Sequence, residues 1–112
     1  MFIISKVMEL LLREDFESEL NLKIKESITH LKRYKVLLLN DDYTSMDFVV
    51  EILMNVFHKS MLESEQVMLT IHRQGKAVCG IYTYEIAQTK VFQVKQLAKK
   101  NGFPLLATLE EA

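Results

Sequence analysis

A short apolar run that ends in polar residues and is followed at once by a helix start is the feature that most constrains this fold. Residues 36–39 (Val-Leu-Leu-Leu) are too few for an independent helix, so they predict a buried strand. Thr44, with Asp47 three residues later, has the capping-box pattern that opens an apolar-periodic helix. The polar residues 40–42 (Asn-Asp-Asp) therefore lie at a corner between strand and helix, where a rigid scaffold holds them at the surface. Such a corner suits recognition better than core building.

Sequence signals in the rest of the chain predict further helices and strands. Ser60 and Glu63 repeat the capping-box pattern, and Gly75 suits the left-handed position that ends a helix. Thr83 is expected to cap a third helix, which Gly102 closes. In chain order, the expected elements are a strand at 34–40, helices at about 45–58 and from Ser60 to Gly75, a strand at 76–82, a helix at 84–101 and a strand at 104–109.

This order, β-α-α-β-α-β, predicts an α+β fold with a three-stranded antiparallel sheet packed against three helices. Because so small a sheet must cover an apolar face to be stable, we expect the helices on one face. Residues 34–112 form the expected domain, and residues 1–33 form an N-terminal extension. Apolar residues recur in the extension at helical spacing, which leaves two interpretations open, an amphipathic helix or a flexible arm. These residues are Ile4, Val7, Met8, Leu11 and Leu12.

The composition narrows the class of function. The 14 Lys and Arg residues against 15 Asp and Glu leave a net charge of -1, which gives no electrostatic basis for binding nucleic acid. The single cysteine, Cys79, rules out an internal disulfide, and its place in a predicted strand indicates a buried thiol in a reducing compartment. No apolar run reaches the roughly 18 residues of a membrane span, and no leader pattern is present. We therefore expect a cytoplasmic protein without a membrane partner.

Residues suited to catalysis or metal binding are sparse. His72 and Asp41 are a candidate catalytic dyad, but no serine or cysteine stands in an activating context. The histidines at positions 30, 58 and 72 lack the short spacings of a zinc site, and no glycine-rich phosphate loop appears. We expect no enzyme, no metal and no cofactor. Two alternatives to a recognition module stay open: a small hydrolase that uses Asp41 and His72, and an oligomeric interaction module driven by the apolar N-terminal stripe.

Four separated segments carry a more specific signal. They are YKVLLLNDDYTSMDFV (34–49), MLTIHRQGKAVCG (68–80), EIAQTK (85–90) and PLLATLE (104–110). In this order they closely resemble the ClpS family, the adaptors of the ATP-dependent Clp protease, over about residues 34–112. The resemblance implies an adaptor that binds proteins with a free α-amino group and a bulky hydrophobic first residue (Leu, Phe, Tyr or Trp). It also implies delivery of these N-degron substrates to the N-terminal domain of a ClpA-type unfoldase, which feeds the ClpP peptidase.

The resemblance also implies roles for particular residues, carried over by motif position. The substrate α-amino group is expected to be held by Asn40, Asp41 and His72. The pocket for the first side chain is expected to be lined by Thr44, Met46, Val49, Met68, Ile71 and Leu105. The unfoldase is expected to dock on a surface that includes Glu85 and Lys90. Ser45 stands where the family often has proline, which is expected to loosen the helix entry slightly without removing its cap.

Overall fold

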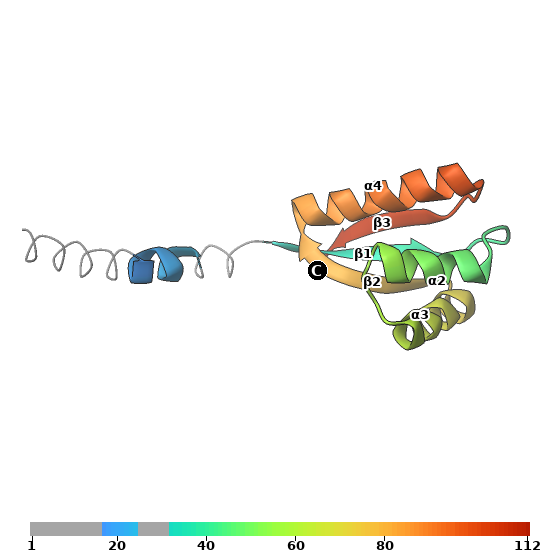
Figure 1. Ribbon diagram of the computed structural model, residues 1–112, viewed down its shortest axis with the longest axis horizontal. Helices are drawn as coiled ribbons and strands as arrows, with labels where there is room; N and C mark the ends of the chain where they lie inside the picture. The colour runs from blue at the N-terminus through green and yellow to red at the C-terminus, as the bar shows by residue number, and fades with distance from the viewer. Residues whose placement is uncertain (1–16, 25–31) are drawn as a thin grey trace, which may run out of the picture. The chain divides into compact units, whose positions relative to one another are not determined.

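The computed structural model describes residues 17–24 and 32–112. The chain divides after residue 31 into two units, and each is described separately. In the first unit, residues 17–24 form a helix (Figure 1). Its side chains are exposed. The apolar stripe predicted for the extension, from Ile4 to Leu12, lies outside the described residues.

The second unit has the predicted α+β architecture. Its elements are β1 (Arg33–Leu39), α2 (Met46–Asn55), α3 (Met61–Gln74), β2 (Lys76–Thr83), α4 (Tyr84–Asn101) and β3 (Leu106–Glu111) (Figure 1). The strands form one antiparallel sheet in the order β2-β1-β3, so β1 is central. The first helix ends earlier than expected, at Asn55, and the last strand begins at Leu106, two residues after Pro104. The predicted element order and sheet are confirmed.

One apolar core joins all three helices to the sheet. Val36 and Leu38 of β1 are fully buried and share this core with residues of α2, α3 and α4. Because side chains alternate along a strand, Val36 and Leu38 point to the same face, and the helices cover that face. On α4 the buried positions recur at helical spacing, at Ala87, Val94 and Ala98.

The helix ends match the sequence signals with two exceptions, at the starts of α4 and α2. Thr83 is the N-cap residue of α4, but its side chain makes no capping hydrogen bond. Ser60 caps α3 by accepting a hydrogen bond from the Glu63 backbone N–H at 3.2 Å, and Gly75 ends that helix with a φ of 87°. At α2, however, the N-cap is Ser45, whose hydroxyl oxygen accepts from the Phe48 backbone N–H at 3.2 Å. The expectation that Thr44 caps this helix is wrong, because the Thr44 hydroxyl donates to Asp41 instead. Ser45 therefore supplies the cap itself.

A bulge in β2 accompanies the burial of Cys79 in the core. Val36 pairs with Gly80 and the next residue of β1 pairs with Val78, so Cys79 is the extra residue. Cys79 is 1% exposed. Tyr82 folds over Gly80 so closely that a Cβ at position 80 would clash with the Tyr82 ring and hydroxyl. Burial raises the pKa of the Cys79 thiol to about 12, despite a hydrogen bond from the backbone of Leu38 and the nearby charge of Lys59.

This burial predicts that Cys79 is inert in the native protein. The thiolate is the reactive form, and a thiol with a pKa of about 12 remains protonated at neutral pH. Ellman's reagent at pH 8 is therefore expected to label the folded protein at the rate of unfolding, and the urea-unfolded protein at once. A Cys79→Ala variant gives the background. Rapid stoichiometric labelling of the folded protein would contradict the burial of this side chain.

Candidate functional site

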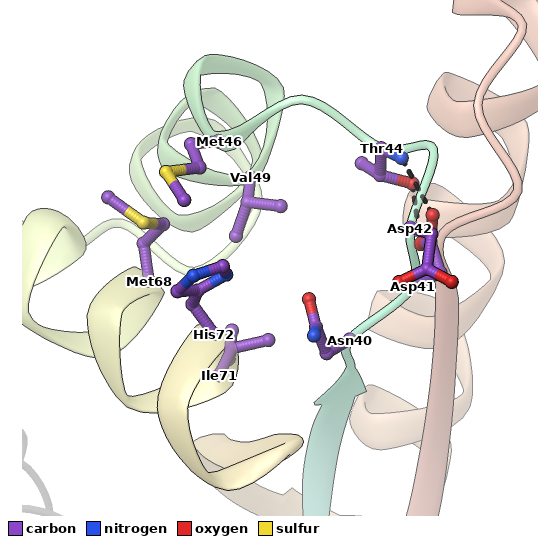
Figure 2. A pocket seen from close by; sticks show the side chains of 9 residues that line it. All are labelled: Asn40, Asp41, Asp42, Thr44, Met46, Val49, Met68, Ile71 and His72. Carbon is purple, nitrogen blue, oxygen red and sulfur yellow. Dashed lines mark hydrogen bonds between the residues drawn. The ribbon is translucent and has the colours of Figure 1, made fainter.

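A pocket of about 240 Å³ opens between α2, α3 and the loop that joins β1 to α2 (Figure 2). The loop supplies the polar side of the pocket, and the two helices supply most of the apolar side. The lining residues are Asn40, Asp41, Asp42, Thr44, Met46, Val49, Met68, Ile71 and His72.

The apolar wall has a buried base and flexible upper parts. Val49 of α2 and Ile71 of α3 are 6% and 2% exposed, so they are fixed by the core. Met46 and Met68 come from the same two helices and approach one another in Figure 2. Met46 is 45% exposed. Because methionine is unbranched and polarizable, these two side chains can adapt to apolar groups of different shape.

The Asp41 carboxylate organises the loop that carries the polar wall. Its Oδ1 accepts hydrogen bonds from the backbone N–H groups of Tyr43 at 2.8 Å and Thr44 at 2.6 Å. Its Oδ2 accepts from the Thr44 hydroxyl at 2.6 Å. Burial raises the pKa of this carboxyl, but the bonds from the Thr44 side chain, the Thr44 backbone and the Tyr43 backbone together hold it below its ordinary value. The carboxylate is therefore ionised at neutral pH and folds the loop around itself.

A second backbone contact fixes the start of the loop against α3. The Asn40 backbone N–H donates to the Gly75 carbonyl oxygen at 2.8 Å. Gly75 is the left-handed residue that ends α3, three residues after His72. This bond brings the end of β1 beside the last turn of α3, and Figure 2 shows the side chains of Asn40 and His72 facing the same space from these two elements.

The structure brings together most of the residues that the sequence singled out for this site. Every residue expected to hold an amino group or line the pocket is in the lining except Leu105. Leu105 is 4% exposed and packs in the core just before β3. The structure adds Asp42, an exposed carboxylate on the polar wall to which the sequence analysis gave no role. Its position directly after Asn40 and Asp41 in the same corner was the available signal.

The polar groups at the pocket can all accept a hydrogen bond from a cation. The Asn40 amide has a carbonyl oxygen, Asp41 and Asp42 have carboxylates, and neutral His72 has one unprotonated ring nitrogen. Among the hydrogen bonds within residues 17–24 and 32–112, those of Asp41 go to Tyr43 and Thr44, not to His72. The arrangement thus lacks the base-orienting bond of an Asp-His dyad and favours binding of a positively charged group.

The two residues expected to dock the unfoldase differ in their surroundings. Glu85 is exposed in the first turn of α4. Lys90 is half-buried, and its Nζ donates to the Val56 carbonyl oxygen at 2.7 Å and lies 5.8 Å from the centre of the Tyr82 ring. Val56 is the C-cap of α2, a helix without a basic residue in its last turn. Lys90 therefore supplies the cation that favours a helix C-terminus and ties α2 to α4.

In residues 17–24 and 32–112, His, Cys, Asp and Glu side chains form no group of three suited to a metal ion. Across the same ranges, each helix is too short or too polar to span a bilayer.

Known proteins are similar in sequence to this chain. Residues 29–108 match the family model described as ATP-dependent Clp protease adaptor protein ClpS. The ATP-dependent Clp protease adapter protein ClpS of Wolinella succinogenes is 56% identical over 99 residues, which cover 87% of this chain and 93% of that protein. The protein of the same name from Syntrophus aciditrophicus is 45% identical over 98 residues, which cover 88% and 92% of the two chains.

A solved structure shares the fold. The structure of ClpS2 from Agrobacterium tumefaciens, bound to L-phenylalaninamide, superposes with a TM-score of 0.72 at 44% sequence identity. The match covers 74% of this chain and 100% of that one. Together with the family match over residues 29–108, which include the whole pocket lining, these relatives show that the chain belongs to the ClpS family of adaptor proteins of the ATP-dependent Clp protease.

Proposed function

We propose that this adaptor binds proteins through a bulky hydrophobic first residue (Leu, Phe, Tyr or Trp) and its free α-amino group. The bound protein is then handed to a ClpA-type AAA+ unfoldase for degradation by ClpP. In this proposal Asn40, Asp41 and His72 hold the amino group, with Asp42 added to the polar side. The chain acts without catalysing a reaction, and its one buried thiol suits a reducing cytoplasm.

The observation that carries the proposal is the two-sided chemistry of the pocket. A protonated chain end presents donors, and the polar wall presents acceptors. The first side chain leaves the same carbon atom as the amino group, and the apolar wall begins beside the polar one. Ile71 and Val49 at the base can receive an apolar side chain, while Met46 and Met68 adapt around it.

The ligand of the Agrobacterium ClpS2 structure supports this choice of substrate. L-phenylalaninamide combines a free α-amino group with a phenylalanine side chain and lacks the charged carboxylate of the free amino acid. It therefore has the chemistry of the first residue of a protein. Such a ligand requires acceptors and an apolar hollow side by side, which is the arrangement of the Asn40–His72 pocket.

The affinity should be modest. A hydrogen bond to a charged group contributes roughly 1.5–3 kcal/mol, and burial of a large apolar side chain roughly 1.5–3 kcal/mol. Several kcal/mol of this are lost on association, so the dissociation constant is expected to be on the order of micromolar.

Peptide binding tests the proposal. A fluorescent peptide that begins with Phe or Leu is expected to bind with a Kd on the order of micromolar in an anisotropy titration. N-acetylation removes the positive charge and should weaken binding on the order of a hundredfold, because the acceptors then face a neutral, bulkier group. His72→Ala and Asn40→Ala should each weaken binding about tenfold.

Arg73→Ala is the matched control, since Arg73 follows His72 in α3 but is exposed outside the lining. It should leave the affinity unchanged. Equal affinity for the free and the acetylated peptide would rule the proposal out.

Asp41→Asn tests whether the carboxylate holds the polar wall in place. The amide has one acceptor oxygen where the carboxylate has two, so the Tyr43 and Thr44 bonds cannot all be kept. We expect a loss of about 1–2 kcal/mol in the free energy of unfolding, allowing for partial exposure, together with weaker peptide binding.

The stabilisation of the fold by the Asp41 carboxylate should depend on pH. The folded-state pKa of Asp41 is lowered, so its stabilisation is present above the ordinary value of 3.8 and is lost as pH falls through the folded-state pKa. The stability difference between wild type and Asp41→Asn should therefore be constant near neutral pH and shrink below about pH 4 in urea titrations. Asp47→Asn, on the exposed first turn of α2, serves as the control. A difference that persists unchanged at pH 2 would contradict the assignment.

Delivery can be separated from peptide binding. Glu85 is exposed on α4, away from the pocket lining, so Glu85→Lys should leave peptide affinity unchanged and reduce docking on the unfoldase N-terminal domain. Glu85 is a better position than Lys90 for testing docking, because substitution of Lys90 also removes its hydrogen bond to the Val56 carbonyl oxygen. Loss of peptide binding in Glu85→Lys would show that the two surfaces are not independent.

A further inference from the structure

The outer face of α4 carries a large aromatic side chain that no other element of residues 17–24 and 32–112 covers. Phe92 is 60% exposed, while the opposite side of the helix packs on β1, β2 and β3. In Figure 1, α4 forms one border of the domain. Within the described residues, the aromatic pairs are Tyr34 with Tyr84 and Phe48 with Phe103, so Phe92 has no aromatic partner there.

Phe92 stands between two apolar hollows. One, of about 530 Å³, lies on the β3 side of α4 and includes Val91 and Leu109 in its lining. The other, of about 330 Å³, lies toward the end of α2 and includes Val56 and Leu97. A protruding side chain with hollows beside it on one surface is what a self-complementary, two-fold contact needs, because each copy offers the other both a knob and a hole.

Two oppositely charged residues lie at equal distances before and after Phe92 on this face. Glu85 lies seven residues before Phe92 and Lys99 lies seven residues after it, and both are exposed. Seven residues are about two helical turns, so Glu85, Phe92 and Lys99 lie along one stripe of the helix surface. The stripe extends roughly 10 Å along the helix axis on either side of Phe92. If two α4 helices run antiparallel with their Phe92 residues at the centre, each Glu85 faces the Lys99 of the other copy.

The remaining exposed positions of the stripe also fit this register. Thr89 and Lys95 lie three residues before and after Phe92, so they face each other across the contact. Gln88 and Gln96, four residues before and after Phe92, face each other in the same way. Like charges therefore do not face each other anywhere along the paired stripe, and Lys95, the charged residue nearest the centre, faces the neutral Thr89. Charged groups at the ends with an apolar centre match the usual anatomy of a protein interface.

We propose that a second copy of this chain covers this surface, through an antiparallel α4–α4 contact centred on Phe92 and closed at both ends by Glu85 and Lys99. The contact is small and reversible, since one helix face per copy supplies it. It covers Glu85, so, resting on the proposed function, the paired form cannot dock on the unfoldase through that residue. Dissociation on dilution then exposes the docking surface.

Sedimentation equilibrium of the full chain tests the pairing directly. The mass is expected to rise from monomer toward dimer between about 10 µM and about 1 mM. Phe92→Ala should weaken association about tenfold or more, as expected for a central aromatic anchor. Leu62→Ala, which truncates an equally exposed apolar side chain on α3, should leave association unchanged.

Charge reversal identifies the register. Glu85→Lys places two lysines opposite each other at both ends of the contact and should weaken association, whereas the double variant Glu85→Lys/Lys99→Glu should restore it. Glu63→Lys, the same reversal in the first turn of α3, is the control and should have no effect. A protein that stays monomeric at about 1 mM overturns the proposal, as does a dimer that Phe92→Ala or Glu85→Lys leaves intact. None of these outcomes depends on peptide binding, so the proposed function stands or falls separately.

Discussion

The binding site depends on one ionised side chain inside a loop. Asp41 accepts three hydrogen bonds from the two residues that lie two and three positions further along the chain, which turns the loop back on itself. These bonds are strong because the acceptor is charged and partly shielded from water. They set the direction in which the chain enters α2, where Ser45 then caps the helix. The same carboxylate thus fixes both the polar wall and the helix that supplies Met46 and Val49.

Two contacts from other parts of the sequence hold this corner in the fold. The bond from the Asn40 backbone to Gly75 joins the start of the loop to the end of α3. The bond from Lys90 to Val56 joins the far end of α2 to α4. Of the two helices that form the apolar wall, α3 is therefore tied to the end of β1 and α2 is tied to α4. The core buries Val49 and Ile71. A pocket built in this way is largely formed before a ligand arrives, which limits the entropy lost on binding.

Much of this architecture was predictable because its signals are local. Apolar periodicity, Ser60, Gly75 and Gly102 set the element order and most helix ends. The cap of α2 was assigned one residue too early, since Thr44 and Ser45 are adjacent hydroxyl residues and the competing acceptor, Asp41, acts through the loop geometry. The burial of Leu105 and the tether of Lys90 depend on contacts between distant segments, which no local pattern records. Phe92 was missed for another reason: a single aromatic residue on a polar helix face resembles ordinary surface until the neighbouring hollows are seen.

In the proposed function, the corner at residues 40–46 and the last turns of α3 together receive a charged chain end and its side chain. An amide NMR titration with L-phenylalaninamide tests it most directly, because each backbone N–H reports on its own surroundings. We expect chemical-shift changes concentrated at residues 40–46 and 68–72, with the exposed stripe of α4 unaffected. Changes centred on α4, or a corner that does not respond at saturating ligand, would contradict it.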